Sequence, residues 1–200
     1  MSTKTLLTGL IALLLILSMS CSFALAAGPW KGKIIDIETK EPLEGTVVVA
    51  FWSMLWRTPA GNVASVYEVK EVLTDKEGRF EMSSYTPINL LPLLSFMRGP
   101  EFIIFKPGYG SLQMVLDKYL MDGDEPKEIK PYEGKLKGYM IKVSKGQIEL
   151  QRLKTREERV KAKPAPVGEP SDWKKQKQFI KAIRDEWQYL YNEDPRRLYL

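Results

Sequence analysis

Two turn motifs, each followed by a short apolar run, constrain this chain more than any other feature. The first extends from Gly32 to Gly45 as Gly-Lys-Ile-Ile-Asp-Ile-Glu-Thr-Lys-Glu-Pro-Leu-Glu-Gly, and the second extends from Thr74 to Gly78 as Thr-Asp-Lys-Glu-Gly. Proline cannot donate to a β-ladder, aspartate bonds the backbone two residues ahead, and glycine accepts a positive φ. Short strands separated by such turns predict an all-β sandwich rather than βαβ units.

Apolar runs recur at the spacing of short strands from residue 30 to residue 153, and helical periodicity is nearly absent there. The run 47–52 is apolar on both faces, so we expect a central strand between the sandwich core and the C-terminal region. The segment 86–100 contains three prolines and is expected to be an ordered loop, and 117–131 a polar loop. The predicted strands are 30–38, 45–52, 65–74, 102–105, 112–116, 139–143 and 147–153.

The stretch 65–74 shows the clearest alternation of apolar and polar residues. Tyr67, Val69 and Leu73 are expected on one side of the strand, as one wet face requires. The turn that follows should return the chain as a hairpin, with Phe80 and Met82 pointing inward.

The first residues are typical of an export signal. A positive start at Lys4, an apolar run at 6–17 and small residues around Ala26 predict a signal peptide cleaved after Ala26. An uncleaved anchor is a rival interpretation, but the apolar run is shorter than the ~20 residues that a spanning helix needs. Lipidation of Cys21 is a third, because Leu17-Ser-Met-Ser-Cys21 fits a permissive bacterial lipobox. We therefore expect an exported protein, periplasmic or secreted, with lipid anchoring as an open alternative.

Cys21 is the only cysteine, so the folded domain cannot contain an intramolecular disulfide. About 170 residues remain after the signal, enough for one apolar core with an appendage. The net charge of +5 is spread over both signs and is too mild to indicate nucleic-acid binding.

The C-terminal part changes from strand to helix patterns. Thr155 and Glu158 form a capping box that predicts a short helix, and 163–170 is a proline-rich linker. Ser171 is expected to cap a longer amphipathic helix, whose apolar stripe comprises Trp173, Ile180, Ile183, Trp187 and Leu190. The helix could hold a partner or lie on an anionic membrane surface, but packing on its own sandwich is favoured. The expected organisation is a signal peptide at 1–26, the sandwich at 27–153, a short helix with linker at 154–170, and the amphipathic helix with its tail at 171–200.

Three motifs occur in a fixed order: Gly-x-Ile-x-Asp-x-x-Thr-x-x-Pro-Leu-x-Gly at 32–45, Thr-Asp-x-x-Gly-x-Phe at 74–80, and Lys-Pro-Gly-Tyr at 106–109. Together they resemble a carboxypeptidase regulatory-like domain. The resemblance implies a transthyretin-like (prealbumin-like) fold, a Greek-key sandwich of about seven strands, in an uncharacterised subset of exported bacterial proteins. It implies no catalytic residue, because the shared positions are turn-formers and core. Thr46, where the family often has alanine, and the proline-rich segment 86–100 depart from the pattern.

The chain contains no histidine, which excludes Ser-His and Cys-His triads and the zinc sites of common exported hydrolases. A histidine-free hydrolase with paired carboxylates stays open as an alternative. Asp122, Asp124 and Glu125 could offer oxygen ligands to calcium, but they lack the spacing of a dedicated loop, so a solvated acidic turn is favoured. No cofactor is expected.

Trp52 and Trp56 are the candidate binding residues, since aromatic side chains are enriched at interfaces. With the 86–100 segment they could recognise a carbohydrate or a peptide. The sequence therefore predicts an exported, non-enzymatic accessory or binding module at the bacterial cell envelope, with an envelope protein or a glycan as partner. Membrane contact is expected only through lipidation or an uncleaved signal.

Overall fold

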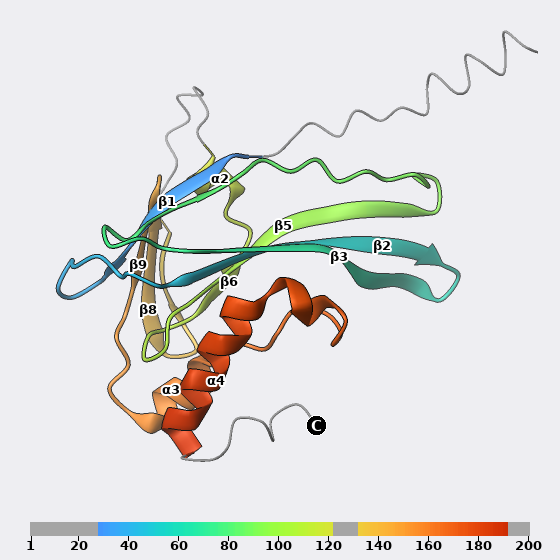
Figure 1. Cartoon of the computed structure of the whole chain (residues 1–200). Helices are drawn as coiled ribbons and strands as arrows, with labels where there is room; N and C mark the ends of the chain where they lie inside the picture. The colour runs from blue at the N-terminus through green and yellow to red at the C-terminus, as the bar shows by residue number, and fades with distance from the viewer. Residues whose placement is uncertain (1–27, 122–131, 192–200) are drawn as a thin grey trace, which may run out of the picture.

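The computed structural model describes residues 28–121 and 132–191, which form two β-sheets and a C-terminal helix (Figure 1). The strands are β1 (Trp30–Asp36), β2 (Val47–Thr58), β3 (Gly61–Leu73), β4 (Arg79–Met82), β5 (Ser95–Phe105), β6 (Leu112–Met114), β7 (Tyr132–Leu136), β8 (Tyr139–Ser144) and β9 (Gln147–Leu150). The helices are α2 (Asp117–Leu120), α3 (Arg156–Ala162), the 3-10 helix η1 (Asp172–Lys175) and α4 (Lys177–Tyr191). The predicted β-sandwich with a C-terminal helix is confirmed at this level.

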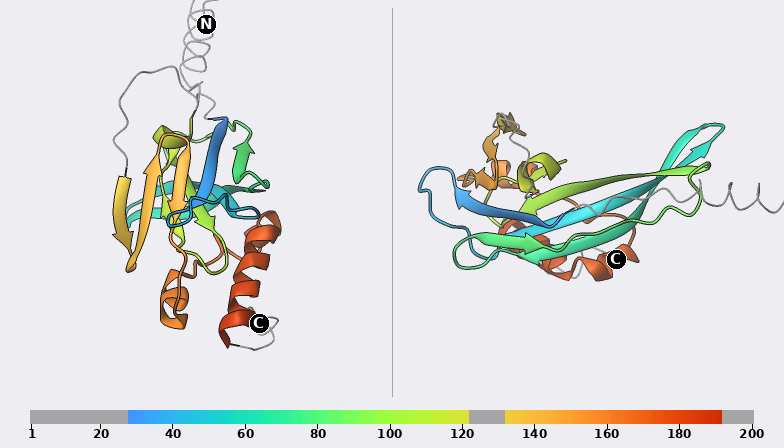
Figure 2. Two further views of the ribbon diagram at one scale, coloured as in Figure 1. Left: turned by 90° about the vertical axis from the view of Figure 1, so that its left-hand side faces the viewer. Right: turned by 90° about the horizontal axis from the view of Figure 1, so that it is seen from above.

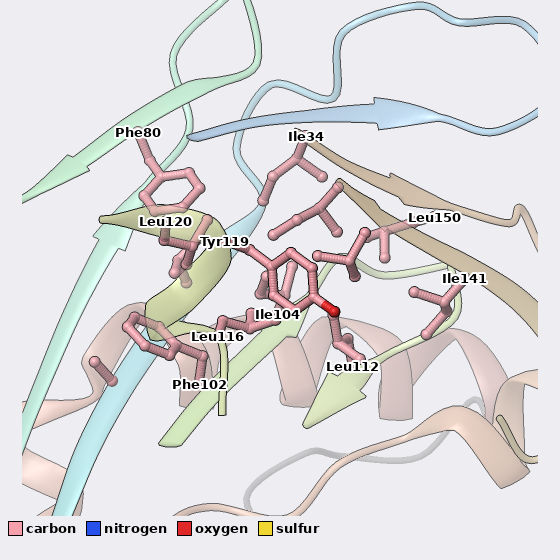
Figure 3. Packing of buried hydrophobic residues seen from close by; sticks show 14 of the residues in the cluster. Ile34, Phe80, Phe102, Ile104, Leu112, Leu116, Tyr119, Leu120, Ile141 and Leu150 are labelled. Atoms are coloured by element: carbon pink, nitrogen blue, oxygen red, sulfur yellow. The ribbon is translucent and has the colours of Figure 1, made fainter. Parts of the chain in front are cut away.

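The first sheet has the strand order β4-β1-β9-β8-β7 and the second has the order β3-β2-β5-β6. Pairing is antiparallel except between β1 and β9, which are parallel. Apolar side chains from both sheets and from α2 fill the space between the layers (Figure 3), among them Ile34, Phe80, Phe102, Ile104, Leu112, Leu116, Leu120, Ile141 and Leu150.

A second core lies on the outer face of the second sheet, where α4 packs. Val47, Val49 and Phe51 of β2 point toward α4 and meet Phe179 and Ile183, while the intervening residues of β2 point into the sandwich. Figure 2 shows α4 lying beside the strands from a second direction. The expectation that residues 47–52 form a central strand covered on both faces is confirmed. The expectation that the C-terminal helix packs on the sandwich of its own chain is also confirmed.

The turn chemistry read from the sequence is also confirmed. The Asp75 carboxylate accepts hydrogen bonds from the backbone N–H of Glu77 at 3.0 Å and of Arg79 at 2.7 Å, and Gly78 has a φ of 73°. Thr155 and Glu158 form the predicted capping box at the start of α3. These local motifs succeed because both partners lie within a few residues of each other.

Two predicted loops and two predicted strands are wrong in extent, since β2 continues to Thr58 and β3 begins at Gly61. Residues 95–100, expected in a loop, belong to β5, and β7 was not expected at all. In the polar loop expected at 117–131, residues 117–120 form α2, which buries Tyr119 and Leu120 in the main core. Leu116, Tyr119 and Leu120 follow the i, i+3, i+4 spacing of a helix, but the pattern covers a single turn and is too short to predict a helix by itself.

The alternation predicted for 65–74 is broken by a β-bulge. Trp52 pairs with Glu68 and Ser53 with Val66, so Tyr67 is the extra residue of β3. Val66 and Val69 both pack toward α4, whereas Tyr67 is exposed. One inserted residue therefore reverses the face of every side chain beyond it.

The long helix starts later than predicted, and its apolar stripe is confirmed in part. Ser171 makes no side-chain cap; residues 172–175 form η1, and α4 begins at Lys177. Trp173 and Trp187 are half-buried, while Phe179, absent from the predicted stripe, is fully buried. Ile180, Ile183 and Leu190 of the predicted stripe are buried as expected, and the break at residue 176 separates only Trp173 from them.

Candidate functional site

The second sheet extends well beyond both α4 and the first sheet (Figures 1 and 2). We call this extension the arm and define it as residues 53–66, the distal part of the β2–β3 hairpin, and residues 83–100, the β4–β5 connection with the first half of β5. Trp56 of β2 pairs with Val63 of β3 and with Ser95 of β5, so three strands continue side by side into the arm.

The far end of the arm displays apolar side chains to solvent. Leu90 is 84% exposed and Leu93 is 85% exposed. We call this surface the tip; its members are Trp56, Val63, Ile88, Leu90, Leu91, Leu93 and Leu94, all of which are exposed. Monomeric soluble proteins rarely expose so many large apolar side chains near one another, so the tip is the candidate interaction surface.

The tip loop is held in shape by its own polar groups. The Asn89 side-chain amide donates to the Ser95 carbonyl at 3.0 Å, and its oxygen accepts from the Leu91 N–H at 3.0 Å and from the buried Ser95 hydroxyl at 3.1 Å. The Leu94 N–H donates to the Leu91 carbonyl at 3.0 Å. These hydrogen bonds fix the backbone that carries the exposed leucines.

Residues of the β2–β3 hairpin also form hydrogen bonds to the tip loop. The Arg57 N–H donates to the Leu94 carbonyl at 2.8 Å, and the Arg57 guanidinium donates to the Leu93 carbonyl at 3.2 Å. That guanidinium also lies 5.6 Å from the centre of the Phe96 ring. The Tyr67 hydroxyl donates to the Ile88 carbonyl at 3.1 Å. The proline-rich segment is therefore an ordered part of the arm.

The two candidate tryptophans are not brought together on one surface. Trp52 is 1% exposed, with its ring centre 5.7 Å from that of Trp30 and 4.7 Å from that of Tyr85. A direct binding role for Trp52 is therefore wrong, because its ring is core. Trp56 is 38% exposed and belongs to the tip.

The predicted calcium candidates Asp122, Asp124 and Glu125 lie outside the described residues, as do Cys21 and Ala26. The tip leucines were missed as individual residues. Their signal was present in the sequence as an apolar run with no strand or helix period.

The arm carries charge of one sign. Residues 53–66 and 83–100 include Arg57 and Arg98 but no aspartate or glutamate, although the whole chain contains 25 acidic residues. Both arginines are exposed. The arm thus combines an apolar end with two exposed arginines.

Buried carboxylates elsewhere are engaged by the structure. Asp36 accepts from the backbone N–H of Glu38 at 2.7 Å and of Thr39 at 3.1 Å. Glu186 accepts from Arg159 at 2.6 Å. Among residues 28–121 and 132–191, no three aspartate, glutamate, cysteine or histidine side chains gather as a metal site would require.

Shifted pKa values arise at separate places in the body. Burial raises the pKa of Asp117, and a hydrogen bond from the Trp30 indole at 2.8 Å partly offsets that rise. Burial lowers the pKa of Lys163, whose ammonium lies 3.9 Å from the centre of the Trp187 ring. Each shift has a packing cause, and the two groups do not share a cleft.

No family model, curated protein or solved structure matches this chain. In the parts of the chain that the structure describes, no helix has both the length and the apolar character needed to cross a membrane.

Proposed function

We propose that this protein is an exported, non-enzymatic binding module of the bacterial cell envelope and that it binds through the tip of the arm. The observation that carries the proposal is the exposure of the tip leucines, Leu90 and Leu93 above all, on a loop whose backbone is fixed. A fixed loop binds without an ordering cost, which favours a recognition role over a flexible linker.

The envelope location rests on the export-like sequence at 1–26. A carboxypeptidase regulatory-like, transthyretin-like domain with Greek-key connections remains part of the proposal. The two-sheet architecture and the turns that follow β1 and β3 support that assignment. Such domains act as accessory modules, which agrees with a binding role.

A carbohydrate or peptide ligand is the second candidate. Trp56 could stack on a sugar or hold an apolar peptide residue, with the loop at 86–94 beside it. A sugar site also needs polar side chains to bind hydroxyl groups, and the tip offers leucine, isoleucine, valine and tryptophan. The residue types therefore favour an apolar partner.

The hydrolase alternative gains no support from Asp36 or Glu186. The Asp36 carboxylate already accepts hydrogen bonds from turn amides, and the Glu186 carboxylate already accepts from Arg159.

Site-specific photocrosslinking in intact cells tests the proposal. A diazirine amino acid is placed at Leu93, in the tip, and separately at Leu73, an exposed leucine at the other end of β3. We expect adducts, to protein or to lipid, from position 93 and few or none from position 73. Equal labelling at both positions, or none at either, would contradict a binding role for the tip.

A further inference from the structure

The arm tip is built to meet a lipid surface. Resting on the proposed function of the tip as the binding surface, we propose that it inserts into the interfacial region of an anionic lipid bilayer. This contact would be additional to any anchoring through residues 1–26.

The first argument concerns the backbone of the tip. Water cannot satisfy backbone groups inside a bilayer, so an inserted loop must bond its own N–H and carbonyl groups. The carbonyls of Leu91, Leu93 and Leu94 all accept hydrogen bonds, from Leu94 N–H, Arg57 and Arg57 N–H respectively. The N–H of Leu91 donates to Asn89. Insertion would therefore not leave these four backbone groups without a partner.

The second argument concerns the position of the charges along the arm. Trp56 pairs with Ser95, and Arg98 follows Ser95 by three residues on β5. At roughly 3.3 Å per strand residue, Arg98 lies about 10 Å behind Trp56. Interfacial segments bury their apolar face by about 5–10 Å. Insertion of the tip to that depth brings Arg98 to the level of the lipid phosphates.

The third argument concerns the residue types of the tip and its surroundings. Tryptophan favours the boundary between head groups and acyl chains, and arginine can extend its guanidinium back to the phosphates. Trp56 fits that boundary, whereas the Arg57 guanidinium is held within the tip by the Leu93 carbonyl and the Phe96 ring. No carboxylate in the arm would be repelled by an anionic surface.

A protein partner would use the tip less well. Protein interfaces contain about one hydrogen bond per 100–200 Å². The side chains of Asn89 and Ser95 already form hydrogen bonds within the loop, so they are not available to a protein partner. The side chains of the tip and the two arginines of the arm therefore offer apolar contact and positive charge. Those two properties favour binding to an anionic bilayer.

Site-specific fluorescence on the full chain tests the inference. An environment-sensitive probe is attached to Leu93→Cys, with Cys21→Ser in the background, and vesicles of phosphatidylcholine with or without phosphatidylglycerol are added. We expect emission to rise several-fold and shift to the blue with phosphatidylglycerol, and nitroxide lipids to quench it. The same probe at Leu73→Cys should stay in water, even if residues 1–26 attach the chain to the vesicles.

Variants separate the contribution of apolar burial to membrane insertion from that of charge attraction. Leu90→Ser with Leu94→Ser should weaken the response of the probe at position 93 about tenfold, because apolar burial drives insertion. Arg98→Glu should remove the preference for phosphatidylglycerol, whereas Lys76→Glu, an equal charge change in the β3–β4 turn, should leave it unchanged. Near-ultraviolet circular dichroism checks that each variant folds.

Each of four outcomes would overturn the inference. A probe at position 93 that stays in water with anionic vesicles excludes insertion. Probe emission that rises with protein concentration, without lipid, assigns the tip to a second copy of the chain. If photocrosslinks from position 93 reach only proteins, lipid binding fails while the proposed function stands; if position 93 forms no crosslinks, both fail.

Discussion

Glu186 carries a carboxylate into the contact between α3 and α4, where its side chain is 2% exposed. Arg159 of α3 donates to it through two nitrogens, at 2.7 and 2.6 Å, and the Gly108 N–H donates at 2.9 Å. A buried charge is tolerated only when a partner and hydrogen bonds replace its water. This single residue therefore joins both C-terminal helices to the turn after β5.

We expect Glu186→Gln to lower the free energy of unfolding by about 3 kcal/mol, because it leaves the Arg159 charge without its counter-ion. Asp185→Asn is the matched control. Asp185 pairs with Lys181 at 2.8 Å on the exposed face of α4, and its loss should cost about 0.5 kcal/mol or less. Urea unfolding of both variants measures the difference. Equal losses of stability would show that the buried Glu186–Arg159 pair contributes no more than the exposed Asp185–Lys181 pair.

Ionisation of Asp117 makes the free energy of unfolding depend on pH. Burial raises its folded-state pKa above the ordinary value of 3.8, so its ionisation penalises the folded state. That penalty is complete above the folded pKa and disappears as the pH falls toward the unfolded value. Asp117→Asn keeps an oxygen to accept from the Trp30 indole and removes the charge.

The Asp117→Asn variant should therefore be more stable than the natural chain at pH 7, and the gain should shrink as the pH approaches 4. Urea unfolding at a series of pH values measures the gain. A gain that stays constant or grows as the pH falls would show that ionisation of Asp117 does not oppose folding.

Contacts between elements decide where α4 begins. The Glu71 carboxylate of β3 accepts from the N–H groups of Gln178 and Phe179, at 2.9 and 3.0 Å, in the first turn of α4. Gln176, just before α4, holds the proline-rich linker by bonding both the N–H and the carbonyl of Val167. The helix is thus capped by a strand 107 residues away in sequence.

Glu71→Ala should cost about 1–2 kcal/mol, because two amides lose their acceptor and the helix N-terminus loses a compensating charge. Glu71→Gln, which keeps an acceptor, should cost less, and Glu77→Ala in an exposed turn should cost almost nothing. Hydrogen exchange reports the effect locally: the amides of Gln178 and Phe179 should exchange faster in Glu71→Ala. Unchanged exchange there would contradict capping by Glu71.

At the scale of the whole molecule, stability and binding occupy different places. Two cores hold the sandwich and α4 together, while the arm extends past both of them (Figure 1). Apolar side chains in the cores are hidden from water, and those of the tip are not. Substitutions in the body should therefore change folding, and substitutions in the tip should change binding.

Leu90→Ser with Leu93→Ser should change the free energy of unfolding by less than about 0.5 kcal/mol, since exposed side chains contribute little to folding. Leu112→Ala, which removes a buried leucine from the main core, should cost about 2–5 kcal/mol. Urea unfolding compares the two. A large loss from the double serine variant would mean that the tip belongs to the fold.

Local pairs in the sequence were sufficient to predict much of this fold. The Asp75–Gly78 turn, the capping box at Thr155 and the inward positions of Phe80 and Met82 follow from partners within a few residues. The two-sided apolar run at 47–52 predicted a strand with a cover on each face. These features needed no knowledge of what lies across the molecule.

Long-range contacts decided the rest. The bulge at Tyr67, the burial of Tyr119 in α2 and the start of α4 depend on strands and helices distant in sequence. Sequence and tertiary structure also contributed different parts of the candidate site. Sequence alone identified Trp56 and the proline-rich segment, but only the tertiary structure shows that Trp52 is core and that the leucines from 90 to 94 face solvent. Exposure is set by what packs against a side chain, and composition carries no record of that.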